Sequence, residues 1–261
     1  MSIIQYILDD PVILPSGAFM LASHLFLFVV FKYLCPEGPW KQMPSFTAHQ
    51  AVAFVAMIYQ TYLGFLHFHD YRDIFGENAG GIYISQFCVG SMLVWDIPVG
   101  LVSDGMGDMI MHVHHIGFFL MASVTMGYFS NGEHLGSAYA PFFFGIIELS
   151  SIPLQIVDLF HPKQKPWHAY MNQYPTLQSL NEICRVLFAL LFVLTRMLAF
   201  PYFTVTSCIT DFWKASQDRP EFSVPCKCVA VANTLFMLLQ LYWGMLLIKQ
   251  ITKALGGGKK R

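Results

Sequence analysis

Charged residues are scarce in this sequence. Only 12% of its 261 residues are Asp, Glu, Lys or Arg, whereas a soluble domain usually carries about a quarter. With 55% hydrophobic residues, a soluble fold would lack the polar surface needed to cover its core. The 15 basic and 16 acidic residues nearly cancel, which leaves a net charge of −1. Nucleic acid is therefore not an expected partner, because proteins that bind it are usually basic.

Several other signals are missing. The first 15 residues contain no Lys or Arg and include Asp9 and Asp10, so they do not resemble a cleavable secretory signal. No polar stretch is long enough to bury a core of its own, and no internal repeat is evident. The six cysteines lie mostly in or beside apolar segments, and the pair Cys226 and Cys228 lacks the spacing of a zinc site. We therefore expect no soluble domain and no metal site.

Long apolar stretches are abundant. A membrane-spanning helix needs about 20 mostly apolar residues, and seven stretches reach this length between clusters of proline and glycine. They lie at residues 14–34, 47–66, 82–101, 108–128, 137–160, 179–205 and 228–250. The sequence thus predicts an all-α, polytopic transmembrane bundle with about seven spans. The sixth stretch contains Arg196 and Pro201, which leaves open whether it crosses straight, kinks or re-enters.

Lys and Arg are distributed unevenly between the two ends of these stretches. With seven crossings, one side receives Lys32, Lys41, Lys163, Lys165, Lys249, Lys253, Lys259, Lys260 and Arg261. The other side receives Arg72, Lys214, Arg219 and Lys227. Because short loops rich in Lys and Arg remain in the cytosol, we expect a lumenal or external N-terminus and a cytosolic C-terminus.

Ionisable residues are costly inside a bilayer, so they usually face the interior of a helix bundle. In this chain they concentrate in the third to sixth stretches. They are Asp96, Asp108, His112, His114, His115, Glu148, Asp158 and Arg196. We therefore expect the third to sixth spans to surround a cavity and the first and last spans to serve as packing helices.

Three histidines lie within four residues at the start of the fourth stretch. At about 100° per residue, Asp108, His112 and His115 share one narrow helix face, while His114 points about 100° away from His115. An acidic group one turn before a histidine can fix its tautomer and raise its basicity. This face is therefore either a proton-handling site or a hydrogen-bonded polar seam that holds helices together.

Two pairings follow from charge and depth. Glu148 and Arg196 have opposite charges at similar membrane depth, and a buried pair is the least costly way to hold both. Such a pair would act either as a clamp between helices or as part of a catalytic site. Asp96 is placed to pair with a histidine of the fourth stretch, because the short loop between the third and fourth stretches makes them antiparallel neighbours.

Five short motifs follow one another along the chain. They are SFTAH at 45–49, GSMLVWD at 90–96, MHVHHIG at 111–117, IELSSIPL at 147–154, and FVLTR at 192–196 with FPY at 200–202. In this order and spacing they resemble the TLC-domain family of membrane proteins, which includes the ceramide synthases. The likeness runs from about His49 to about Ile251.

The resemblance implies a helical bundle that encloses a lipid-sized cavity in a membrane of endoplasmic-reticulum type. It divides the chain into an N-terminal segment with the first span (1–44), a TLC-type domain (45–251) and a basic cytosolic tail (252–261). The expected partners are membrane lipids, with a homo- or hetero-oligomer left open.

The resemblance also bears on chemistry. In ceramide synthases, paired histidines and aspartates on the following helix transfer a fatty acyl group from acyl-CoA to a sphingoid amine. Here His114 and His115 match the pair, whereas Glu148, Leu149 and Ser150 stand in place of the synthase aspartates. This departure weakens the expectation of acyl transfer.

Two functions remain in view. The favoured one is a role in lipid metabolism or membrane lipid homeostasis by binding or sensing lipids. The alternative is a ceramide-synthase-like N-acyltransferase that uses acyl-CoA as co-substrate and no other cofactor.

The candidate catalytic residues are His114, His115, Asp96 and Glu148, and the candidate lipid- or substrate-binding residues are His112, Asp108, Arg196 and Asp158. A membrane di-iron oxidase is disfavoured because the histidine spacing is wrong, and a transporter because no repeated half pattern is present.

Epitope tags at the two termini test the predicted orientation. After selective permeabilisation of the plasma membrane, a C-terminal tag should bind antibody and an N-terminal tag should not. Equal access to both tags would contradict the odd number of spans.

Overall fold

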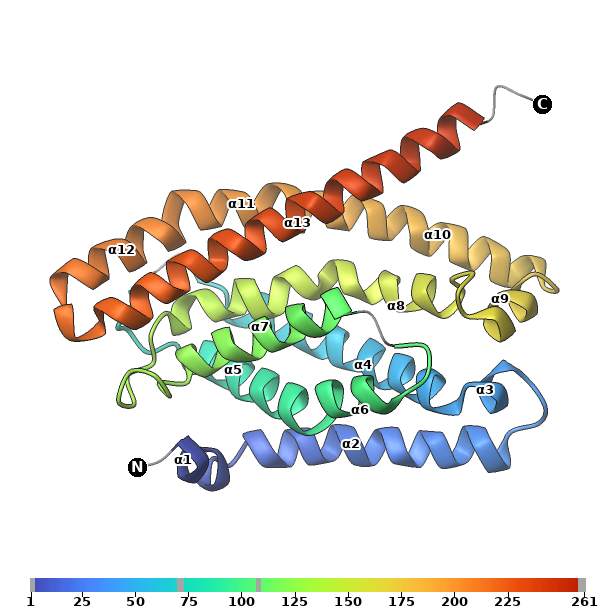
Figure 1. Ribbon diagram of the computed structural model, residues 1–261, viewed down its shortest axis with the longest axis horizontal. Coiled ribbons are helices and arrows are strands. Elements are labelled where there is room, and N and C mark those ends of the chain that lie inside the picture. The colour runs from blue at the N-terminus through green and yellow to red at the C-terminus, as the bar shows by residue number, and fades with distance from the viewer. Residues whose placement is uncertain (1–2, 70–72, 107–108, 258–261) are drawn as a thin grey trace.

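The computed structural model describes residues 3–69, 73–106 and 109–257. Within these ranges the chain forms helices and turns and contains no strand. Most helices run along one common direction and form an elongated bundle (Figure 1). The short helix α1 is viewed end-on in the same picture, so its axis lies across the bundle.

The elements follow one another in this order. The first half comprises α1 (Ile3–Asp9), α2 (Ile13–Val29), η1 (Val30–Leu34), α3 (Pro39–Gln42), α4 (Pro44–His67), α5 (Ala79–Ser91), η2 (Met92–Asp96), α6 (Ile97–Val102) and α7 (Met109–Thr125). The second half comprises η3 (Ser137–Tyr139), η4 (Pro141–Gly145), η5 (Ile146–Ser150), α8 (Ser151–Leu159), α9 (Lys165–Met171), α10 (Pro175–Phe192), η6 (Val193–Ala199), α11 (Phe200–Phe203), η7 (Thr204–Cys208), α12 (Ile209–Asp218), η8 (Pro220–Phe222) and α13 (Ser223–Gly257).

All seven predicted spans fall on helical segments. Five described segments are long and apolar enough to cross a membrane: Ile13–Leu34, Ala79–Val102, Pro141–Leu159, Pro175–Asp218 and Pro220–Lys253. Of the other two, α7 is apolar but has only 17 residues. Helix α4 has 24 residues but is more polar along its length than the five spanning segments. The predicted all-α transmembrane bundle is confirmed.

The sixth stretch is longer than predicted. We expected it to end near residue 205, but the helical segment continues to Asp218 and contains 44 residues. At about 1.5 Å per residue it spans roughly twice the ~30 Å hydrocarbon core, so it extends beyond a single crossing. Figure 1 shows α10, α11 and α12 as one bent rod. The wide turns η6 and η7 flank α11, which contains Pro201, and such turns and prolines are common causes of helix bending.

Glycines let the central helices approach closely. A Cβ atom added to Gly64 of α4 would lie 2.5 Å from the backbone nitrogen of Ile146, and one on Gly145 would lie 2.5 Å from the Cα of Gly64. Gly17 of α2 and Gly90 of α5 meet in the same way, each against backbone of the other helix. Small residues at such crossings allow backbone contact between membrane helices, and they bring the polar side chains of neighbouring helices within reach of one another.

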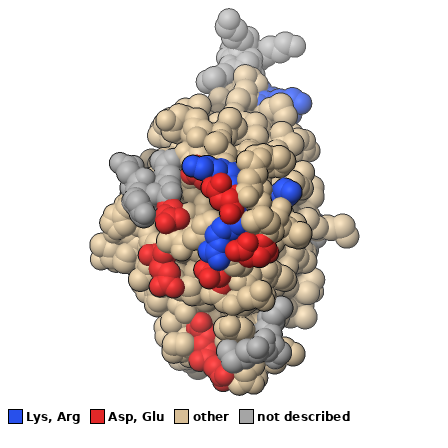
Figure 2. Space-filling view, turned by 90° about the vertical axis from the view of Figure 1, so that its left-hand side faces the viewer, with Lys and Arg blue, Asp and Glu red and all other residues tan. Residues whose placement is uncertain are grey.

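The two ends of the bundle differ in charge. Acidic side chains gather at the end that carries α1 and the turn between α12 and α13, with fewer Lys and Arg among them (Figure 2). The opposite end carries η1, α3, α9 and the end of α13 (Figure 1). Its described basic residues are Lys32, Lys41, Lys163, Lys165, Lys249 and Lys253. The predicted separation of the described basic residues is thus present, while Arg72, Lys259, Lys260 and Arg261 lie outside the described residues.

The substitution Gly64→Ala tests the close crossing of α4. The added methyl group would overlap rigid backbone, and overpacking of this kind costs about 1–3 kcal/mol. The melting temperature of the purified protein in detergent should therefore fall by several degrees. Gly244→Ala is the matched control, because its methyl group would meet the flexible Met197 side chain. Equal melting temperatures for both variants would contradict the crossing.

Candidate functional site

A large cavity occupies the middle of the bundle. Its volume is about 880 Å³, within the range of small-molecule binding sites. It extends from Asp96, His115 and Glu148 at the centre to His161 and Lys163 at the basic end. The lipid-sized cavity that the resemblance implied is therefore present.

The helices that line the cavity differ from those expected from the sequence. Trp243, Leu246, Leu247 and Gln250 of α13 line it, and so does much of α4. The prediction that the last span only packs against the others is therefore wrong. Ionisable residues mark cavity helices in a membrane sequence, whereas α13 supplies a mostly apolar wall that carries no such signal.

Asp96 stands between two histidines at the cavity floor. Its Oδ1 lies 3.0 Å from His49 Nε2 of α4, and its Oδ2 forms a close ion pair with His115 Nδ1 of α7. Asp96 and His49 are each 6% exposed, and the His49 ring stacks on Trp95 with ring centroids 4.7 Å apart. The predicted pairing of Asp96 with a histidine of the fourth stretch is confirmed.

This arrangement orients His115 chemically. A carboxylate that contacts Nδ1 holds the imidazole in one position and leaves Nε2 for another partner. His115 lines the cavity, with 24% of its side chain exposed. Its Nε2 is therefore the nitrogen that can exchange a proton with, or attack, a molecule bound in the cavity.

His114 has different surroundings. Its ring meets Trp243 and Phe236 of α13 edge to face, at centroid distances of 5.3 and 5.5 Å. Its Nδ1 is buried and has no hydrogen-bond partner among the described residues. The two adjacent histidines are thus unequal, since His115 has a carboxylate partner and His114 has an aromatic enclosure.

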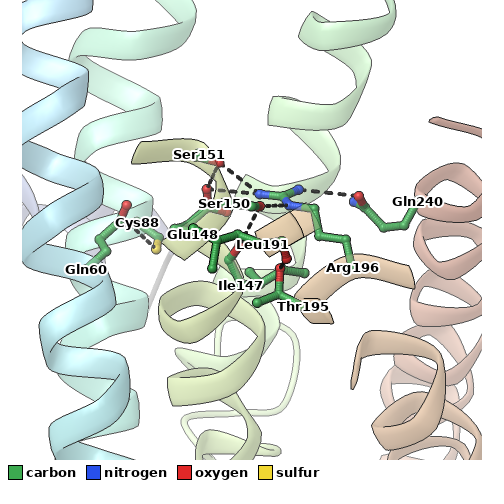
Figure 3. A network of polar contacts seen from close by, with 10 residues as sticks. All are labelled: Gln60, Cys88, Ile147, Glu148, Ser150, Ser151, Leu191, Thr195, Arg196 and Gln240. Carbon is green, nitrogen blue, oxygen red and sulfur yellow. Dashed lines mark hydrogen bonds and ion pairs between the residues drawn. The ribbon is translucent and has the colours of Figure 1, made fainter. Parts of the chain in front are cut away.

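Glu148 and Arg196 form the predicted ion pair. Arg196 Nη2 lies 3.2 Å from Glu148 Oε2 and 2.9 Å from Ser151 Oγ. Arg196 Nε donates to Ser150 Oγ at 2.8 Å, and Nη1 reaches Gln240 Oε1 of α13 at 3.4 Å. Figure 3 shows the guanidinium group between η5 and α8 on one side and Gln240 on the other. The pair is well supplied with hydrogen bonds, which a buried ion pair requires.

A second, narrower pocket lies behind this ion pair. His114, Phe118, Glu148 and Arg196 line both spaces. The smaller one, of about 50 Å³, continues among mainly aromatic and aliphatic side chains toward Gly136 and Phe212. His114, Glu148 and Arg196 thus lie at the junction between a wide cavity of mixed polarity and a narrow, mainly apolar pocket.

The remaining predicted site residues take less central positions. His112 lines the cavity, with its ring against Gly100 of α6. Asp158 lines it nearer the basic end. Asp108 lies outside the described residues, so the predicted face of Asp108, His112 and His115 is described only for the two histidines.

Sequence reasoning missed several members of the site. His49 appeared only within the motif at 45–49, although a histidine in the second span is itself an ionisable group in a membrane segment. Ser150 and Ser151 appeared only within the motif at 147–154, and Gln240 gave no signal, because a neutral polar residue in an apolar helix is common. Their roles depend on the position of Arg196.

Two further properties of the site concern metal binding and the histidine at the cavity mouth. Among the described residues, no three or more His, Cys, Asp or Glu side chains are grouped so that they could hold a metal ion. At the cavity mouth, partial burial and the nearby charge of Lys163 lower the pKa of His161. This shift favours the neutral form of the ring.

Comparison with known families gives one result. A family model described as the TLC domain matches residues 47–249. The match includes the His49, Asp96, His115, Glu148 and Arg196 positions. Comparison with curated proteins and with solved structures gave no significant match.

Glu148→Leu tests the buried ion pair. It leaves the Arg196 guanidinium without its carboxylate, and removing one partner of a buried pair costs about 3–5 kcal/mol. Thermal unfolding in detergent should show a large loss of stability, and the double variant Glu148→Leu with Arg196→Met should recover most of it. Glu182→Leu, in the exposed pair with Arg185, should change stability little. A single variant as stable as the parent chain would contradict the pairing.

Proposed function

Since the chain belongs to the TLC-domain family, we propose that it binds a membrane lipid in the central cavity and acts in lipid metabolism or membrane lipid homeostasis. The cavity of about 880 Å³ is the observation that carries this proposal. It lies inside a bundle of apolar helices, with ionisable groups at its floor.

The lining suits an amphipathic ligand. Phe188 and Phe192 of α10, with Leu246 and Leu247 of α13, offer an apolar wall for alkyl chains. His115 Nε2 offers a contact for a polar group. A lipid with one or two chains and a hydrogen-bonding head group combines these properties.

The family supports a location, and the charge distribution supports an orientation. We propose a membrane of endoplasmic-reticulum type, with the basic end of the bundle in the cytosol. The N-terminus is then lumenal and the C-terminus cytosolic. The cavity would open toward the cytosolic leaflet, where His161 and Lys163 lie at its mouth.

A second candidate function is N-acyl transfer from acyl-CoA to a sphingoid base. The orientation of His115 by Asp96 favours it. In that reaction the amine attacks the thioester carbonyl, the C–N bond forms and the C–S bond breaks. His115 Nε2 takes the proton from the amine and passes it to the departing thiolate.

One observation ranks this candidate second. Glu148 is engaged by Arg196 and by Ser151, whose hydroxyl donates to Glu148 Oε2 at 2.6 Å. The carboxylate on the helix after the paired histidines is thus neutralised, so it is poorly suited to act as a further base.

Met57→Trp tests lipid binding. Met57 of α4 lines the cavity, so an indole there should reduce the lipid that co-purifies with the full chain at least tenfold, measured by extraction and mass spectrometry. Ile58→Trp is the matched control, because Ile58 is 44% exposed on the same helix and faces outward. Equal lipid content in both variants and the parent chain would sink the proposal.

The double variant His114→Ala with His115→Ala separates the two functions. We expect it to keep bound lipid, because the apolar walls are unchanged. An acyltransferase would be seen as amide formation by the purified parent chain from fatty acyl-CoA and a sphingoid base, lost in the double variant. His168→Ala, outside the cavity, is the control. Amide formation by the parent chain would promote the second candidate above the first.

A further inference from the structure

Helix α8 presents a row of side chains to the cavity. Ser151, Leu154, Gln155 and Asp158 all line it, and this spacing places the four residues on one helix face. The row begins at Ser151, which contacts Arg196 at the cavity floor, and ends at Asp158, one residue before the helix ends. Asp158 therefore lies between the floor of the cavity and its basic end.

Asp158 has no protein partner in the part of the chain that the structure describes. Its side chain is half-buried, and no ion pair or hydrogen bond joins its carboxylate to a described residue. Asp96 and Glu148, which also line the cavity, each form an ion pair. Because an unpaired carboxylate inside a membrane bundle is costly, a cationic ligand in the cavity would offset that cost.

Two hydrogen-bond donors follow Asp158 at the mouth of the cavity. His161 and Lys163 both line the cavity and are exposed. The backbone N–H of Lys163 donates to His161 Nδ1 at 3.2 Å, so a neutral His161 ring carries its hydrogen on Nε2. That N–H and the Lys163 ammonium group can both donate to the oxygens of a phosphate.

The cavity thus offers two charges of opposite sign in a fixed order. From the floor outward, the Asp158 carboxylate comes first and the Lys163 ammonium group comes second. The two groups are near enough for their charges to interact, yet they form no ion pair. A ligand whose alkyl chain points toward the floor therefore meets the carboxylate before it meets the ammonium group.

We propose that the cavity mouth binds a lipid whose ammonium group lies next to its alkyl chain and whose phosphate lies beyond the ammonium group. Asp158 binds the ammonium group, and Lys163 and His161 Nε2 bind the phosphate. The alkyl chain extends along Phe188 and Leu247. Phosphorylated long-chain amino alcohols have this order of groups. The inference rests on the proposed binding of a lipid in the cavity and names the class of that lipid.

Other lipids match this arrangement less well. A fatty amine pairs with Asp158 but leaves the Lys163 ammonium group near a like charge. An alkyl phosphate pairs with Lys163 but brings a second negative charge close to Asp158. Ethanolamine phospholipids carry both charges in the reverse order, since their amine lies beyond the phosphate. Like charges brought together in this way are a common source of specificity.

Competition binding tests the order of the two charges. The purified full chain in detergent would be incubated with tritium-labelled sphingosine 1-phosphate, and unlabelled single-chain lipids would be compared as competitors. Unlabelled sphingosine 1-phosphate should displace the label at concentrations about tenfold lower than three other lipids. These are sphingosine, which lacks the phosphate, lysophosphatidic acid, which lacks the amine, and lysophosphatidylethanolamine, which has the reverse order. Equal displacement by any of the three would overturn the proposal.

Two single variants assign the contacts. Asp158→Asn should weaken the binding of sphingosine 1-phosphate about tenfold without weakening that of lysophosphatidic acid, which also shows that the variant is folded. Lys163→Gln should weaken the binding of both phosphates and leave sphingosine binding unchanged. Asp218→Asn and Lys165→Gln are the matched controls, because both residues are exposed and neither lines the cavity.

Failure of this inference is distinguishable from failure of the proposed function. Parental affinity for sphingosine 1-phosphate in Asp158→Asn would overturn the inference. So would a parent chain that co-purifies with another lipid but does not bind the label, and in that case lipid binding in the cavity would still stand. A parent chain that neither co-purifies with lipid nor binds the label would contradict both.

Discussion

The structure depends on how a mostly apolar bundle keeps ionisable groups away from lipid. Unpaired charges in such surroundings are very costly, so each one must meet a partner on a neighbouring helix. Asp96 meets His49 and His115, and Glu148 meets Arg196 with three neutral side chains around it. These two clusters tie α4, α7, α8 and α13 together through the turns η2, η5 and η6. The positions of the helices therefore follow from the pairing as much as from apolar packing.

The same clusters define the functional space. Glu148 and Arg196 lie where the wide cavity meets the narrow apolar pocket, while Asp96, His49 and His115 line the wide cavity alone. The two clusters differ in what they leave available. His115 retains a ring nitrogen toward the cavity, whereas Glu148 is engaged by Arg196 and Ser151. His115 is thus the group that can exchange a proton with a bound molecule, and the arginine–glutamate cluster joins neighbouring helices.

Several features were predictable from local sequence. Seven apolar stretches predicted the helices because length and apolarity are properties of consecutive residues, and the opposite charges of Glu148 and Arg196 predicted their pairing. The end of the sixth stretch was misjudged because a helix continues through polar residues once its backbone hydrogen bonds are established. Asp211 and Lys214 therefore lie within a helical segment that ends at Asp218. The lining role of α13 was also missed, since apolar side chains look the same whether they face lipid or a cavity.

The sequence by itself determined that this chain is a helical membrane protein of the TLC-domain type with expensive polar groups in its middle spans. Hydrophobicity along the chain and short ordered motifs suffice for that. Only the tertiary structure decided that His49 rather than another histidine completes the Asp96 cluster and that Gln240 reaches Arg196. These contacts join residues far apart in the chain, up to 47 positions for His49 and Asp96. They arise from helix crossings whose geometry no local pattern specifies.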